Sequence, residues 1–277
     1  MRFGIITDVH LGPVAYKDGK PAKLTGYAES LTRQVVQRWR ERQQPELVLN
    51  LGDVLEDVSA PVDRDNYRLC CSLLDDAGVP VLHVAGNHDQ VHLSDDELVS
   101  LWQLRERWPQ AERHAGSSAY WAEFAGCRFI VLSTRWAPPR GVYLGAGQLE
   151  FLERSLSSAP GHCIVLTHQS LSEMDLRGNH WFEPEPHMCL IHERAQIRAS
   201  IERAGNVRAV FNGHAHWNHV DVIGGVPYIT LQSLTENITR DAEPTPASSS
   251  ALVELEPRRL ELSVEGGQPL RFSFQTP

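Results

Sequence analysis

Alternating strand and helix patterns in the first half of the chain restrict its fold most strongly. Three short apolar runs are predicted strands: residues 2–7, 46–51 and 79–84. Three amphipathic segments are predicted helices: residues 24–42, a segment from Tyr67 to about Gly78, and residues 94–108. The last begins with a capping box, Ser94 with Glu97. This alternation predicts right-handed βαβ units and a largely parallel sheet.

The second half of the chain is richer in strands. A hairpin is predicted from 119–124 and 127–133 around Gly126, and Gly224-Gly225 joins a second pair at 218–223 and 226–231. Further strands are predicted at 162–167 and 207–212, and helices at 147–158 and 193–204. Antiparallel strands within 251–274 are expected to complete the second sheet. We therefore predict a single domain over residues 1–277.

Composition excludes several classes of protein. The 277 residues are 42% hydrophobic and 22% charged, with a formal charge of −9, so general binding to nucleic-acid polymers or anionic membranes is not expected. No stretch has the length of a transmembrane helix, and no signal peptide is apparent. The five cysteines show no CxxC spacing, which predicts reduced, mostly buried thiols in a cytoplasmic protein. The sequence leaves the oligomeric state open.

Five motifs carry side chains that can bind a divalent metal, and each follows a predicted strand. They are Asp8-Val9-His10, Gly52-Asp53, Gly86-Asn87-His88-Asp89, His168, and Gly213-His214-Ala215-His216. Ligands of open α/β sheets bind beyond the carboxyl ends of the strands, so these motifs are expected to converge. The remaining histidines that we assign to packing or solvent are His83, His92, His114, His162 and His192.

The mixture of carboxylate, amide and imidazole ligands predicts the type of metal centre. Such a set suits Mn, Fe, Zn or Co better than Mg or Ca. Seven ligands exceed the needs of one structural zinc but suit two ions: Asp8, His10, Asp53, Asn87, His168, His214 and His216. Two-metal centres are typical of phosphoryl transfer.

The ordered set of motifs, spread over residues 2–231, resembles the calcineurin-like metallophosphoesterase superfamily. The resemblance implies a four-layer α/β/β/α sandwich, with two mixed sheets flanked by helices. It also implies one ion held by Asp8, His10, Asp53 and His216, and a second held by Asp53, Asn87, His168 and His214. His88 would act near the leaving group, while a hydroxide activated by both ions attacks phosphorus.

One position departs from the family pattern. The family usually has Asp three residues after the bridging Asp, where it pairs with the catalytic histidine; this chain has Glu56. We expect Glu56 to reach His88 with its longer side chain, and Asp57 is the alternative partner. The predicted catalytic residues are therefore His88 and Glu56.

Loops around the predicted centre should decide the substrate, a small phosphate compound. Trp181 and Trp217 are candidates to bind a nucleobase, whereas Lys17, Lys20 and Lys23 are expected to lie on a solvated surface. The favoured function is a phosphodiesterase for a small organic or nucleotide-type diester. The alternatives are a diphosphatase of the ADP-ribose or CDP-alcohol type, a phosphomonoesterase, and a non-catalytic binding module on the same fold.

Overall fold

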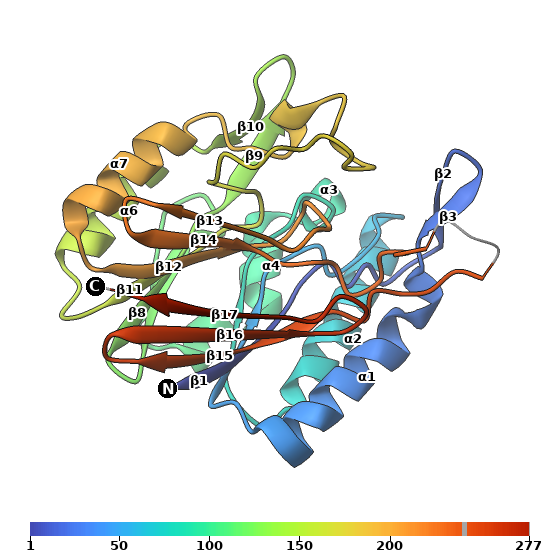
Figure 1. The fold of residues 1–277 in the computed structure, drawn as a ribbon, viewed down its shortest axis with the longest axis horizontal. Helices are drawn as coiled ribbons and strands as arrows, with labels where there is room; N and C mark the ends of the chain where they lie inside the picture. The colour runs from blue at the N-terminus through green and yellow to red at the C-terminus, as the bar shows by residue number, and fades with distance from the viewer. Residues whose placement is uncertain (240–242, 277) are drawn as a thin grey trace.

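Two mixed β-sheets pack face to face, and helices cover their outer faces (Figure 1). The computed structural model describes residues 1–239 and 243–276. The order of the first sheet is β17 (Leu270–Gln275), β16 (Arg259–Glu265), β15 (Ser250–Glu256), β1 (Arg2–Ile6), β4 (Leu47–Asn50) and β5 (Val81–His83). The order of the second is β13 (His219–Ile223), β14 (Val226–Thr230), β12 (Val207–Asn212), β11 (Cys163–Leu166), β8 (Cys127–Val131), β7 (Tyr120–Phe124) and β6 (Glu112–Arg113). The predicted four-layer architecture is confirmed.

Each sheet contains a parallel block whose carboxyl ends lie on the same edge of the molecule. In the first sheet β1 pairs parallel with β4, and β4 with β5. In the second, β11 pairs parallel with β8 and β12, and β12 with β14. The segments that leave these strands therefore meet above one edge of the sandwich.

Helices lie outside both sheets and bury one apolar face each. On the first sheet these are α1 (Ala28–Arg38), α2 (Ala60–Asp75) and α4 (Asp95–Leu101); on the second they are α6 (Gln148–Ser157) and α7 (Arg194–Ala204). The capping box of Ser94 and Glu97 is present at the start of α4. Shorter turns complete the set: η1 (Thr25–Tyr27), η2 (Trp39–Gln43), α3 (Asp89–His92), α5 (Leu104–Arg107) and η3 (Pro186–Met188).

The main core fills the space between the sheets. Phe3 of β1 meets Phe129 of β8 and Phe211 of β12 edge to face, with ring centroids 5.9 Å apart in both pairs. These side chains are fully buried because strands of parallel blocks are covered on both faces. A second core lies between β11, β12 and the helices α6 and α7. Strand positions beside the site are thus fixed by packing.

Three expectations about the elements are wrong. The strands at 251–274 join the first sheet, where β15 pairs antiparallel with β1, because alternation predicts a strand but not the edge that it extends. The expected helix over 94–108 is interrupted at Gln103, whose φ is 51°. Residues 11–26 and 134–146, which were expected to form loops around the centre, hold two short hairpins, β2 (Ala15–Lys17) with β3 (Lys20–Lys23) and β9 (Thr134–Ala137) with β10 (Gly141–Leu144).

Two further features bear on the class of protein. No helix among the described residues is long and apolar enough to cross a membrane. All five cysteines are free, and four of them are buried. Burial raises the pKa of Cys163 to about 12, so this thiol stays protonated at neutral pH.

Candidate metal centre

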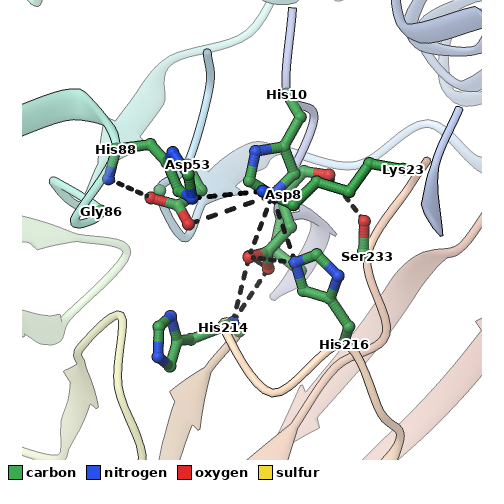
Figure 2. A network of polar contacts seen from close by, with 12 residues as sticks. Asp8, His10, Lys23, Asp53, Gly86, His88, His214, His216 and Ser233 are labelled. Atoms are coloured by element: carbon green, nitrogen blue, oxygen red, sulfur yellow. Dashed lines mark hydrogen bonds and ion pairs between the residues drawn. The ribbon is translucent and has the colours of Figure 1, made fainter. Parts of the chain in front are cut away.

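The predicted ligand residues meet above the carboxyl ends of the parallel strands. Asp8 and His10 follow β1, Asp53 follows β4, His168 follows β11, and His214 and His216 follow β12. Figure 2 shows Asp8 and His10, from one loop, and Asp53 and His216, from two others, pointing toward one another. All six side chains are buried. Segments far apart in sequence therefore supply one cluster of carboxylates and imidazoles.

The first half of the cluster consists of Asp8, His10 and His216. His10 Nε2 lies 3.2 Å from His216 Nε2, and His216 Nε2 lies 3.3 Å from Asp8 Oδ1. Asp8 is held in turn by its own neighbourhood, because the Thr7 hydroxyl donates to Asp8 Oδ2 over 2.6 Å. Three possible ligand atoms thus face one point.

The second half consists of Asp53, His168 and His214. His168 Nε2 lies 3.1 Å from Asp53 Oδ2 and 3.2 Å from His214 Nδ1. Asp53 Oδ2 is also 3.9 Å from His10 Nε2 of the first half. Asp53 therefore lies between the two halves, where one carboxylate can serve two ions.

The outer nitrogens of these histidines define which ring nitrogen faces inward. His168 Nδ1 donates to the Leu51 carbonyl over 2.8 Å, His214 Nε2 to the Met188 carbonyl over 2.9 Å, and His216 Nδ1 to Glu236 over 2.6 Å. His10 Nδ1 lies 3.0 Å from Glu56 Oε2, off the line of an ideal hydrogen bond. With the outer nitrogen carrying the proton, the inner nitrogen of a neutral ring offers only a lone pair.

The spacing of the facing imidazole nitrogens fits metal ions. His10 faces His216, and His168 faces His214, each pair with nitrogens 3.2 Å apart inside the buried cluster. Two nitrogens bound to one ion at about 2.1 Å lie roughly 3.0–3.4 Å apart, which matches the observed spacing. Outer carboxylate and carbonyl acceptors are the usual partners of metal-bound histidines. The donor set therefore fits two divalent ions.

Backbone strain is concentrated in the same residues. Asp8, His10 and Asp53 have φ of 51°, His216 has 52° and His214 has 66°, all in the left-handed region. This conformation is uncommon outside glycine and costs about 1–3 kcal/mol per residue. Such strain clusters at functional sites, and here it turns successive side chains toward one point.

Burial and the neighbouring carboxylates act in opposite directions on the pKa values of the histidines in the cluster. Burial opposes charge on His168 and His216, but the neighbouring carboxylates outweigh it and raise the pKa of each to about 9. Burial lowers the pKa of His10 to about 4 and of His214 to about 3. The histidines beside carboxylates thus hold protons that metal binding would release.

His88 lies at the rim, with Asp57 as its partner. Its Nδ1 donates to Asp57 Oδ1 over 2.5 Å, whereas Glu56 Oε2 is 4.0 Å away. The expected pairing of Glu56 with His88 is therefore corrected: Glu56 contacts His10, and the next residue in the chain reaches His88. Burial opposes charge on His88, but Asp53 and Asp57 outweigh it and raise its pKa.

Asn87 and Asp89 flank His88 and have different surroundings. The Asn87 amide oxygen accepts from Gln169 Nε2 over 3.1 Å and lines the cavity described below. Asp89 is buried and accepts from the backbone N–H groups of Asp53, Val54 and Gly86 over 2.8–3.0 Å. Asp89 thereby ties the loop after β4 to the loop after β5.

Two residues of the centre were not predicted as part of it. Glu236 follows β14 and accepts from both His216 and Trp181 Nε1. The sequence feature that could have identified Glu236 is its position as a carboxylate after a strand of the parallel block. Lys23 was expected on a solvated surface, but it is only 5% exposed and its ammonium lies 2.8 Å from Glu56 Oε2.

A cavity of about 530 Å³ opens over the centre. Its floor contains Asp53, Asn87, His88, His214 and His216. Its walls are largely apolar: Tyr16, Val91, Trp136, Val142, Trp181, Phe182 and Met188. Tyr16 and Trp136 come from the two short hairpins and are 65% and 49% exposed. Trp217 lines a different cavity, of about 520 Å³, which shares His216 with the first.

Comparison with known proteins identifies the family. The model of the calcineurin-like phosphoesterase family matches residues 1–218. The chain belongs to the calcineurin-like phosphoesterases. It is therefore a hydrolase acting on phosphoric esters, with a centre for two divalent metal ions.

Relatives and solved structures agree with this assignment. A Fibrobacter succinogenes protein named a probable cyclic nucleotide phosphodiesterase is 21% identical over 220 residues, covering 78% of this chain and 73% of that protein. The fold is similar to a dimetal phosphatase from Danio rerio, with a TM-score of 0.76, 18% identity, and coverage of 100% of this chain and 99% of that one. A purple acid phosphatase from yellow lupin seeds has a TM-score of 0.67 at 14% identity, covering 99% of this chain and 53% of that one.

Proposed function

We propose that this phosphoesterase is a phosphodiesterase for a small organic or nucleotide-type diester. The observation that carries the proposal is the cavity of about 530 Å³, with the metal-ligand cluster in its floor and aromatic walls above it. A diester keeps a second organic group on phosphorus, and apolar walls can bind that group. The similarity to a protein named for cyclic nucleotide phosphodiesterase activity supports the same class.

The proposed ligands follow from the two halves of the cluster. Asp8, His10, Asp53 and His216 would hold one ion; Asp53, Asn87, His168 and His214 would hold the other. The two ions supply Lewis-acid stabilisation of the phosphoryl oxygens and lower the pKa of water for attack on phosphorus. Mn, Fe, Zn and Co all suit these oxygen and nitrogen donors.

His88 is proposed as the proton donor. It is not one of the ligands, but its backbone N–H donates to Asp53 Oδ1 over 2.9 Å, so it is fixed beside the centre. Asp57 orients the ring from Nδ1, which leaves Nε2 on the other side for the leaving oxygen. A raised pKa keeps His88 protonated to higher pH than an ordinary histidine, as an acid requires.

The aromatic walls are proposed to hold the organic part of the substrate. Trp181 is fixed by its hydrogen bond to Glu236 and lies near His216, at 5.9 Å between ring centroids. Trp136 stands at the exposed end of the same cavity. Binding of a remote group there would support positioning of phosphorus for attack. Trp217, in the neighbouring cavity, becomes the weaker of the two predicted candidates.

A substrate panel tests the proposal. Purified protein is stripped of metal, reloaded with Mn, Co or Zn, and assayed for kcat/KM on matched monoesters, diesters and pyrophosphates. Nucleotide-type diesters are expected to be the best substrates, and Trp136→Ala should weaken them while sparing a small aryl diester. If monoesters are turned over faster than every diester, the chain is assigned to the phosphomonoesterases. If pyrophosphates are turned over faster than every diester, it is assigned to the diphosphatases.

A further inference from the structure

Lys23 is a buried cation at the active-site cavity that the five motifs do not include. It ends β3, is 5% exposed, and lines the cavity together with Asp53, Asn87 and His88. Its Nζ lies 2.8 Å from Glu56 Oε2 and 3.2 Å from His88 Nε2. The second contact concerns the nitrogen of His88 that is not turned toward Asp57.

Lys23 is the counterion of Glu56, and its ammonium also contacts His88. Glu56 Oε2 lies 3.0 Å from the neutral ring of His10 as well, at Nδ1. Lysine is almost never fully buried, because removing its charge from water costs several kcal/mol. An ammonium has three N–H donors, and Glu56 accepts from one of them; a protonated His88 is itself a donor at Nε2 and accepts none. The side chain therefore retains donor capacity at the cavity.

The surroundings of Lys23 fix its position. Its backbone forms an antiparallel bridge with Glu236, and the N–H of Leu24 donates to the Thr235 carbonyl over 2.8 Å. The Trp181 ring covers the ammonium, which lies 5.4 Å from the ring centroid. Because the backbone bridge and the Trp181 ring already hold the ammonium in place, it loses little further conformational freedom when a ligand binds.

We propose that Lys23 is a further catalytic residue, whose ammonium holds the leaving oxygen of the substrate together with His88. Lys23 Nζ and His88 Nε2 are 3.2 Å apart, so an oxygen within hydrogen-bond distance of one is within reach of the other. When the P–O bond breaks, its electron pair stays on the leaving oxygen. His88 supplies the proton, and Lys23 donates a hydrogen bond that stabilises the developing negative charge.

This inference rests on the proposed role of His88 and predicts a dependence on the leaving group. Lys23→Met removes the charge while keeping the length of the side chain. It should lower kcat/KM about 10²-fold for esters with alkyl leaving groups, whose oxygen needs stabilisation. Esters of 4-nitrophenol should be affected far less, since that phenolate leaves without help.

Two variants serve as controls. Lys17→Met removes a lysine whose Nζ is 5.0 Å from the same Trp181 ring but which does not line this cavity, and it should keep the wild-type dependence on leaving group. Lys23→Arg keeps a cationic donor and should recover part of the activity on alkyl esters. Lys23→Gln gives the same test as Lys23→Met if the latter does not fold.

Metal content and thermal unfolding are measured on every variant. Two ions per chain in Lys23→Met, with a penalty that grows with leaving-group pKa, support the proposal. An equal penalty for all leaving groups, or loss of metal, would overturn it and leave Lys23 as a positioning residue for Glu56 and His10. The leaving-group series is made in whichever ester class the wild-type protein prefers. An incorrect assignment of diesters as the substrate class is therefore detected by the substrate panel, separately from the role of Lys23.

Discussion

At the scale of single residues, the centre is built from pairs in which one group fixes another. Glu236 orients His216, two carbonyls orient His168 and His214, and Asp57 orients His88. At metal sites in other proteins, removal of an outer partner of this kind typically lowers metal affinity or activity about 10–100-fold. The residues proposed as ligands could be predicted because each motif follows a strand, whereas the positions of Glu236 and Lys23 depend on a backbone bridge between distant segments.

Asp53 should be required for both ions. Its carboxylate lies 3.1 Å from His168 and 3.9 Å from His10, so Asp53→Ala removes a ligand atom from both halves of the cluster. Metal analysis after dialysis should find both ions depleted and activity lost, and chelation should abolish wild-type activity until metal is returned. Asp76→Ala, at an exposed carboxylate, is the control. Full activity of Asp53→Ala in metal-free buffer would refute the assignment.

Asp57 should set the alkaline limit of activity. His88 has a raised pKa, to which Asp57 contributes, and its protonated form is lost as pH rises through that pKa. Asp57→Asn removes one of the charges that raise the pKa of His88, so the alkaline limb of the kcat profile should move to lower pH. The measurement is kcat against pH on an ester with an alkyl leaving group. Asp57→Glu, which keeps the charge, should shift the limb less; an unmoved limb in Asp57→Asn would exclude this partnership.

At the scale of elements, close approach of loops decides the geometry of the centre. Glycine precedes a ligand in three of the motifs, at Gly52, Gly86 and Gly213. A Cβ at Gly213 would overlap the Thr7 hydroxyl and the Asp8 carboxylate, and one at Gly86 would overlap Asp53. These loops therefore have glycine where the backbone of one loop lies against a proposed ligand residue of another loop. Long strands and helices could be predicted from periodicity, but β2–β3 and β9–β10 could not, because each of their strands has only three or four residues.

Gly213→Ala should damage the metal site more than the fold. The added methyl group displaces Asp8, a ligand of one proposed ion, while the strands of both sheets keep their packing. We expect a loss of metal from that site and destabilisation by about 1–3 kcal/mol, as for other overpacked positions. Metal titration and urea unfolding measure the two effects. Gly26→Ala tests the contribution of flexibility alone, since a Cβ there meets nothing within 4 Å and the backbone is not left-handed; equal metal loss in both variants would contradict the steric explanation.

At the scale of the whole molecule, the sandwich holds the two strand edges in fixed relation. Phe3 packs against Phe129 and Phe211 of the opposite sheet, and β1 and β12, which carry Phe3 and Phe211, lead into the loops of Asp8 and His214. The family resemblance implied this arrangement, but the expectation that the last strands join the second sheet was wrong. Edge choice depends on which backbone groups are left unpaired, and the free edge of β1 takes β15. Ionisable groups inside this core make its stability depend on pH.

His83 should weaken the fold as pH falls. It lies in β5 against Trp102, with ring centroids 5.8 Å apart, and burial lowers its pKa from 6.5 to about 3. Above pH 6.5 the ring is neutral in both states and contributes no pH dependence. Below pH 6.5 the unfolded chain binds a proton at His83 that the folded chain does not. The free energy of unfolding therefore falls by about 1.4 kcal/mol per pH unit.

The variant His83→Phe isolates this contribution, because it keeps the stacking on Trp102 but cannot titrate. It also leaves Asn50 Nδ2 without its 3.2 Å partner, a loss that is independent of pH. The free energy of unfolding is measured in urea at pH 7 and pH 5 on both proteins with metal removed, so that ion loss does not differ between them. Between these two pH values wild type should lose about 2 kcal/mol more than the variant. Parallel losses in the two proteins would show that His83 titrates normally in the folded state.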